Sequence, residues 1–205
     1  MSKKASSANL SKREQLRGER RRRSLLWNAG ILGGIGVVIL FVVYYFIASA
    51  GPGPLPGELS APRDFPDEGR GHAEDGTGLT FQHYPPSSCT HYNNPAAWRV
   101  YTSPVPEGAF VHNLEHGGVV FLYYCDTPCP DLEQQFNDFY KKAPTENRFG
   151  ERKILISPYD KAKMPSPIVA LAWTHQLNLQ KFDEATMLLW YKRFVNGGPE
   201  GKDQP

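Results

Sequence analysis

The chain has 205 residues, 21% of them charged and 40% hydrophobic, which is enough for one ordinary domain with appendages. Its net charge of +2 is unevenly distributed, because residues 1–23 carry nine Lys and Arg against two Glu, and the remainder has a net charge of −5. A basic face that could meet phosphates is therefore not expected on the folded domain, which excludes nucleic acid as its partner.

The apolar run LLWNAGILGGIGVVILFVVYYFIASA lies in a window that has no charged residue between Arg23 and Glu58. About 20 apolar residues suffice for a helix to cross a bilayer core of about 30 Å. Residues 24–50 are therefore predicted to form a transmembrane helix, with residues 25–48 in contact with the lipid bilayer.

The basic residues 1–23 orient this predicted helix, because Lys and Arg accumulate on the cytoplasmic side. The chain is accordingly expected to be a single-pass protein of the cell membrane, with a cytoplasmic N-terminal tail and an extracytoplasmic C-terminal domain. A cleaved signal peptide ending at Ala48-Ser49-Ala50 is the alternative. The apolar run is longer than the ~7–15 residues of the apolar region in a signal peptide, which favours the uncleaved anchor.

Residues 51–76 are rich in Gly, Pro and acidic residues and have no apolar periodicity. They are predicted to form an extended stalk. The folded domain is expected to span residues 77–198, and residues 199–205 are expected to be a short C-terminal tail.

Within the domain, short apolar and β-branched runs alternate with amphipathic segments. The predicted order is β-β-β-α-β-β-α, which gives an α+β fold with a mostly antiparallel sheet and two packed helices. Asp183 is the expected N-cap of the second helix, and Gly197 its stop. The predicted strands are residues 79–84, 97–101, 117–125, 152–158 and 167–173, and the predicted helices are residues 129–144 and 182–198.

The stretch VHNLEHGG places His112 and His116 four residues apart, which puts them on one side of either a helix or a strand. His91, in the loop PPSSCTHYNNP, is expected to supply a third imidazole. Three imidazoles suit zinc or copper, and a nitrogen-ligand site favours copper on affinity. Cys89 and Met164 are candidate further ligands. The simpler alternative is that these histidines are ordinary hydrogen-bonded residues of turns.

Glu115 lies between the two histidines and is expected to orient an imidazole or to hold a turn rather than to do chemistry. The segment His112-x-x-Glu115-His116 also fits the H-x-x-E-H pattern of zinc peptidases, which need a long helix at this point. Gly117 and Gly118 interrupt such a helix, so this reading is disfavoured. No catalytic residue is assigned, and an enzyme is not favoured. A non-catalytic accessory or interaction subunit of a membrane-protein assembly remains open.

Three cysteines are present. Cys125 and Cys129 are close enough to pair across a turn, and the C-x-x-x-C spacing lacks the setting of a thioredoxin-like redox centre. A structural disulfide between them is the simplest interpretation. Cys89 is then free, unless it pairs with one of the other two or binds metal.

Three segments, PPSSCTHY, YTSPVPEGAFVHNLEHGGVVFLYYC and ISPYDKAKMPSPIVALAW, together resemble the domain of unknown function 3105 family. The resemblance covers about residues 79–173, and its core is the His-x-Leu-Glu-His-Gly motif that begins at His112. It implies a membrane-tethered domain outside the cytoplasm and a shared polar site at His91, His112 and His116, without a reaction. The family's Ser-Gly-Pro-His segment corresponds to residues 88–91, where Cys89 and Thr90 replace Gly and Pro.

Overall fold

The computed structural model describes residues 33, 34, 36–42, 44 and 62–205, and the chain falls into two compact units, residues 1–53 and 54–205. The described residues of the first unit are helical. The predicted transmembrane helix at residues 24–50 lies mostly outside the described residues. Among those that are described, no helix has both the length and the apolar character needed to cross a bilayer.

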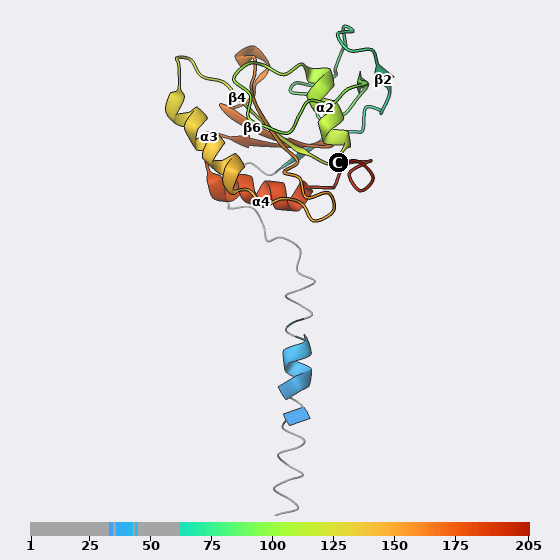
Figure 1. Ribbon diagram of the computed structural model, residues 1–205, viewed down its shortest axis with the longest axis vertical. Coiled ribbons are helices and arrows are strands. Elements are labelled where there is room, and N and C mark those ends of the chain that lie inside the picture. The colour runs from blue at the N-terminus through green and yellow to red at the C-terminus, as the bar shows by residue number, and fades with distance from the viewer. Residues whose placement is uncertain (1–32, 35, 43, 45–61) are drawn as a thin grey trace, which may run out of the picture. The chain divides into compact units, whose positions relative to one another are not determined.

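The second unit is an α+β domain built on a five-stranded, mostly antiparallel sheet, as the pattern of the sequence predicts (Figure 1). Strands β4 and β5 are parallel, and the other neighbours are antiparallel. In spatial order the strands are β1 (Arg63–Asp64), β7 (His175–Leu179), β6 (Ile168–Ala172), β4 (Val119–Tyr123) and β5 (Ile154–Pro158).

A second, two-stranded sheet is formed by β2 (His72–Ala73) and β3 (His91–Tyr92). The two strands run parallel, and their register places His72 directly beside His91. This pairing brings together two histidines from segments that are far apart in the sequence.

The described residues of the second unit form three α-helices: α2 (Glu107–Glu115), α3 (Pro130–Lys142) and α4 (Glu184–Phe194). Helix α3 begins with Pro130, whose missing N–H costs nothing at a first helical position. Helix α4 begins after Asp183, whose carboxylate accepts a hydrogen bond from the Thr186 N–H, so the expected N-cap is confirmed. A 3-10 turn covers Lys161–Lys163.

The two faces of the sheet carry separate apolar cores, because neighbouring side chains of β4 point to opposite faces. Phe121 packs with residues of α3 and α4 in one core. Val120 and Leu122 pack with Phe110 and Leu114 of α2 in the other. Figure 1 shows α3 and α4 together, away from α2. The second core therefore supports the helix that carries the HNLEH motif.

Several predicted elements differ from the structure. Residues 79–84 form no strand; Phe81 reaches the second core from an irregular segment that runs into two prolines. Of residues 97–101, only Val100 makes a bridge, to Ile156. Helix α2 and strand β7 were not expected as regular elements. The segment at residues 62–76, expected as stalk, contains β1 and β2, and β1 pairs with β7 in the main sheet.

A buried carboxylate, that of Glu146, organises the loop after α3. It accepts hydrogen bonds from the backbone N–H groups of Arg148, Phe149 and Glu151 and from the Asn196 side chain. Burial alone would raise the pKa of Glu146, but the hydrogen bonds, from Arg148 and Asn196 first, outweigh burial and lower the pKa to about 2.

Replacing Glu146 with glutamine is expected to lower the free energy of unfolding by about 1–3 kcal/mol at pH 7. Because the folded-state pKa is depressed, this stabilisation is present above the ordinary carboxyl pKa and disappears as the pH falls toward 2. Urea unfolding of both proteins at pH 7 and pH 3 measures the difference. A difference that is equally large at both values would contradict this account.

Candidate metal site

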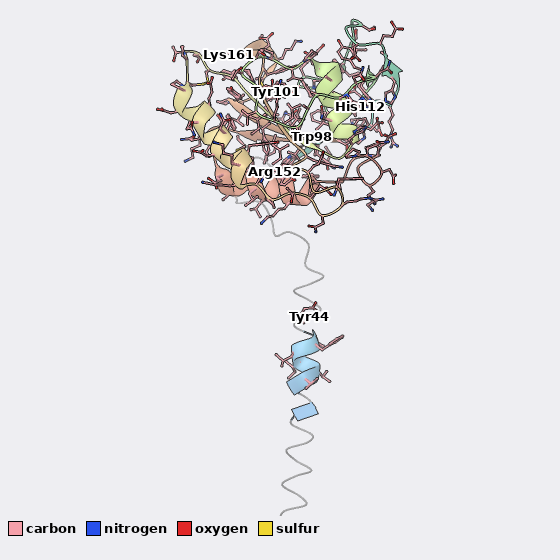
Figure 2. The ribbon with its side chains drawn as sticks, in the orientation of Figure 1. Tyr44, Trp98, Tyr101, His112, Arg152 and Lys161 are labelled. Atoms are coloured by element: carbon pink, nitrogen blue, oxygen red, sulfur yellow. A yellow bond between two sulfur atoms is a disulfide. The ribbon has the colours of Figure 1, made fainter. Side chains whose placement is uncertain are left out.

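Four side chains converge where α2 packs against β3. His112 and Glu115 lie three residues apart near the end of α2, so they project from the same side of the helix. His91 comes from β3 and His72 from its neighbour β2. One ligand atom from each of these four residues lies within 4.8 Å of the others. His112, His91 and Glu115 are buried, whereas the His72 side chain is 41% exposed. Figure 2 labels His112 on α2.

Backbone carbonyls fix the orientation of two of the imidazoles. His91 Nδ1 lies 2.8 Å from the Cys89 carbonyl oxygen, and His112 Nδ1 lies 2.7 Å from the Tyr92 carbonyl oxygen. Since a carbonyl only accepts, Nδ1 must be the protonated nitrogen in both rings. In a neutral ring this leaves the lone pair on Nε2, which is the arrangement found in histidines that bind metal ions. The lone pair of His112 Nε2 faces His116 Nε2 at 3.0 Å.

The contact between His91 and Glu115 is the most informative one. Glu115 Oε2 lies 2.9 Å from His91 Nε2, at ion-pair distance, but the two atoms do not form a well-aligned hydrogen bond, and both are buried without a partner among the described residues. With the proton on Nδ1, a lone pair of His91 faces a carboxylate oxygen. Two acceptors at this distance repel each other unless a cation or an extra proton lies between them.

Burial also sets the charge states. It lowers the pKa of His91 and of His112, so both rings are neutral near pH 7. Burial, together with the nearby Glu200, raises the pKa of Glu115. A cation bound within the cluster would stabilise the charged form of Glu115. Neutral imidazoles beside a buried carboxylate are the donor set that a divalent transition metal needs.

His116 follows α2 as its C-cap residue and lies at the edge of this group. Its Nε2 is 3.0 Å from His112 Nε2 and 3.8 Å from Glu200 Oε2. Burial first, and then the neighbouring His112, lowers the pKa of His116 to about 4. The structure thus places His116 beside His112, but the four-residue group contains Glu115 and His72 instead.

Cys89 and Met164 are the other two candidate ligands, and each would offer a sulfur atom. The thiol of Cys89 is free and partly buried, and it points to the Thr80 carbonyl oxygen, 4.0 Å away, as a weak donor. Met164 packs at the border of the second core, after the 3-10 turn. Cys89 contributes its carbonyl rather than its sulfur to the cluster, by holding His91 Nδ1.

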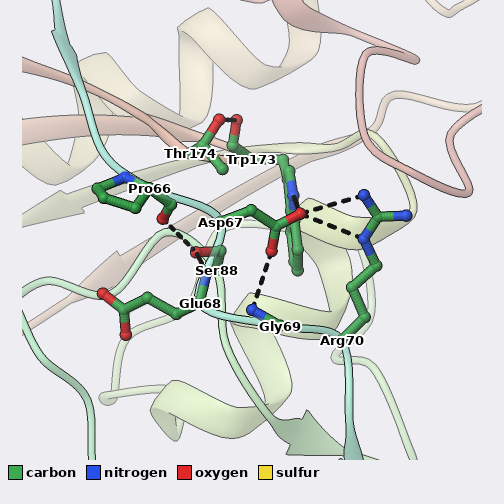
Figure 3. Close-up of polar contacts among 8 residues, drawn as sticks. All are labelled: Pro66, Asp67, Glu68, Gly69, Arg70, Ser88, Trp173 and Thr174. Atoms are coloured by element: carbon green, nitrogen blue, oxygen red, sulfur yellow. Dashed lines mark hydrogen bonds and ion pairs between the residues drawn. The ribbon is translucent and has the colours of Figure 1, made fainter.

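The sequence does not point to His72 as a ligand, because this residue lies in a Gly- and acid-rich segment with no periodic pattern. A hydrogen-bonded turn just before it fixes this segment on the domain (Figure 3). The Asp67 carboxylate accepts hydrogen bonds from Gly69 N–H, the Arg70 side chain and Trp173 Nε1. The Trp173 ring in turn contacts the ring of His91 edge-on. Asp67 therefore links the segment before β2, the strand of His72, to Trp173, whose ring contacts His91.

A peptidase would need His112 and His116 as ligands and Glu115 free to act as a base. Helix α2 does carry His112, but it is nine residues long and ends at Glu115. The Glu115 carboxylate lies against His91 within the candidate ligand group. This geometry gives Glu115 the position of a ligand rather than that of a base.

Cys125 and Cys129 form a disulfide, the pairing expected from their spacing. The bridge joins the segment after β4 to the residue before α3. It lies outside the histidine cluster and contributes no ligand to it.

The family described as "Protein of unknown function (DUF3105)" matches residues 72–205. The match begins at His72 and therefore includes all four residues of the candidate ligand group. Comparison with curated proteins and with solved structures finds no match.

Proposed function

Since the chain belongs to the DUF3105 family of proteins of unknown function, we propose a function from the site itself: the domain binds a transition-metal ion, copper before zinc, through His72, His91, His112 and Glu115. The observation that carries this proposal is the unpartnered pair of His91 Nε2 and Glu115 Oε2, 2.9 Å apart in a buried position. A metal cation between them would replace a repulsive contact with two ligand bonds.

The donor set narrows the class of metal. Three imidazole nitrogens and one carboxylate oxygen suit zinc or copper better than magnesium or calcium, which prefer oxygen ligands. Copper has the higher intrinsic affinity for nitrogen-rich sites. Two of the residues that would hold the ion, His91 and His112, are already oriented by backbone carbonyls, so these two rings need little ordering when it binds.

The metal content of the protein tests this proposal. The full chain, stripped with a chelator and reloaded with Cu²⁺ or Zn²⁺, is expected to retain about one ion, whereas the His91→Ala/His112→Ala variant returns to background. His175→Ala is the matched control, because His175 pairs with Asp64 outside the cluster. Circular dichroism verifies that the variants are folded. Equal metal content in the double variant and the unaltered chain would refute the proposal.

We propose further that this domain is held at the outer face of a cell membrane. The support is the apolar run at residues 24–50 and the excess of basic residues before it. The chain is then expected to stay with the membrane fraction after an alkaline wash and to lose its domain to protease added outside the cell. Release by the alkaline wash would contradict a membrane anchor.

A further inference from the structure

The end of the ligand-bearing helix α2 is held by residues distant in the sequence. The last carbonyls of a helix have no partner within the helix and must find one elsewhere. Here the Glu115 carbonyl accepts from the Glu200 N–H at 3.0 Å, and the Gly117 carbonyl accepts from the Asn196 N–H at 2.8 Å. We call residues 196–205 the capping segment.

The fit between the capping segment and α2 is close. A Cβ atom added at Gly198 would lie 2.3 Å from the Leu114 carbonyl oxygen, 2.4 Å from the Glu115 carbonyl oxygen and 2.5 Å from the Gly117 nitrogen. All three atoms belong to the backbone, so they cannot move aside as a flexible side chain would. Only glycine allows the segment to approach the helix end this closely.

Lys153 links the capping segment to the residue that follows α2. Its side chain is fully buried, and its Nζ donates to the carbonyl oxygens of His116 at 2.9 Å, Gly201 at 3.1 Å and Gln204 at 2.6 Å. An ammonium group is costly to bury unless its donors are satisfied, and here three carbonyls satisfy them. Two of these belong to the capping segment, and the third follows α2, whose C-terminal end favours a positive charge.

We propose that Lys153 and the capping segment are positioning elements of the metal site. They hold the backbone of Glu115 and His116, and thereby keep the Glu115 carboxylate against His91 and the His116 ring beside His112. This inference rests on the proposed metal-binding function. Because coupling is reciprocal, a bound metal must in turn stabilise the docked capping segment.

Two variants test the positioning role in the full chain. Gly198→Ala pushes the segment from the helix end, and Gly78→Ala is its matched control, since a Cβ at Gly78 meets nothing within 4 Å. Lys153→Met keeps the length of the side chain but removes its donors. Both Gly198→Ala and Lys153→Met are expected to release Cu²⁺ to a chelator at least about tenfold faster and to alter the visible and EPR spectra of the bound ion.

Hydrogen exchange supplies the reciprocal measurement. The backbone amides of the capping segment, which are those of residues 196–204 other than Pro199, are expected to exchange more slowly in the metal-loaded chain than in the metal-free chain, and faster in Gly198→Ala than in Gly78→Ala. The spectra separate positioning from mere loss of stability, because a less stable protein with an intact site gives unchanged spectra.

The outcomes are distinguishable. Faster exchange of the capping segment in Gly198→Ala, with unchanged metal release and spectra, would overturn the positioning role and leave metal binding intact. Equal exchange of the segment with and without metal would overturn the reciprocal coupling. An unaltered chain that retains no copper would refute the proposed function itself, and the inference with it.

Discussion

Glu115→Gln is expected to stabilise the metal-free protein while abolishing the stabilisation that metal provides. In the metal-free protein, the glutamine amide donates a hydrogen bond to His91 Nε2, which replaces two facing acceptors and removes a buried charge. The gain is expected to be about 1 kcal/mol in the free energy of unfolding.

The Glu115→Gln variant is expected to lose the stabilisation that added metal provides. A metal present at 100 to 1,000 times its dissociation constant stabilises a protein by about 3–4 kcal/mol. The unaltered chain is expected to show this increase in Cu²⁺ or Zn²⁺, whereas Glu115→Gln shows little of it, because an amide is a poor ligand beside three imidazoles. Glu115→Gln is therefore expected to be the more stable of the two proteins without metal and the less stable one with metal.

Chemical denaturation of both proteins, with and without metal, measures this reversal in the order of stability. His91→Ala serves as the comparison, since it also loses the metal response but gains no new hydrogen bond in the metal-free state. A Glu115→Gln protein that is less stable than the unaltered chain without metal would show that the carboxylate has a favourable structural partner, and would argue against a cation site between Glu115 and His91.

The second prediction with a large expected effect compares core substitutions on the two faces of the sheet. Phe121→Ala is expected to lower the free energy of unfolding by about 3–5 kcal/mol, because a buried aromatic ring leaves a cavity that the surroundings fill only partly. The Phe121 ring packs edge-to-face against Phe139 of α3, with centroids 5.5 Å apart. Since this core lies on the face opposite α2, the folded variant is expected to retain its metal.

The neighbouring residue provides the matched comparison. Leu122→Ala is expected to cost about 2–5 kcal/mol, and it removes packing from the core that supports Phe110 and Leu114 of α2. We expect this variant to lose metal affinity as well as stability, even below its unfolding temperature. Thermal unfolding and metal titration measure both properties. Equal metal affinity in the two variants would mean that the second core does not position the ligands.

Much of the domain was predictable because its elements carry strong local patterns. Strands β4, β5 and β6 are short apolar runs that contain β-branched residues, and α3 and α4 combine helical spacing with proline or aspartate at their starts. The disulfide followed from the spacing of Cys125 and Cys129.

Helix α2 was not predictable in the same way. It is nine residues long, includes Gly108, has no side-chain N-cap and is followed by two glycines. Isolated helices of this length are unstable in water. Its stability comes from burial of Phe110, Val111 and Leu114 against the sheet, which is a tertiary effect that no local pattern records.

The histidine cluster was predictable only in part, for a similar reason. His91 and His112 were expected to meet, and the structure brings them together. His72 joins them through strand pairing between β2 and β3, a contact between residues 19 positions apart that has no signature in either segment. Glu115 was expected to orient an imidazole, and the structure places its carboxylate within the cluster, 2.9 Å from His91 Nε2. The direction of this side chain depends on α2 being helical to its last turn, which the sequence pattern does not predict.

The pairing of β2 with β3 has a consequence for variation among relatives of this chain. His72 and His91 are direct neighbours in a ladder only two residues long. The exposed residues 74–78 of the connection between the two strands can therefore gain or lose residues without harm to the cluster. A deletion that shifts the pairing by a single position would instead turn one imidazole to the opposite face of the ladder.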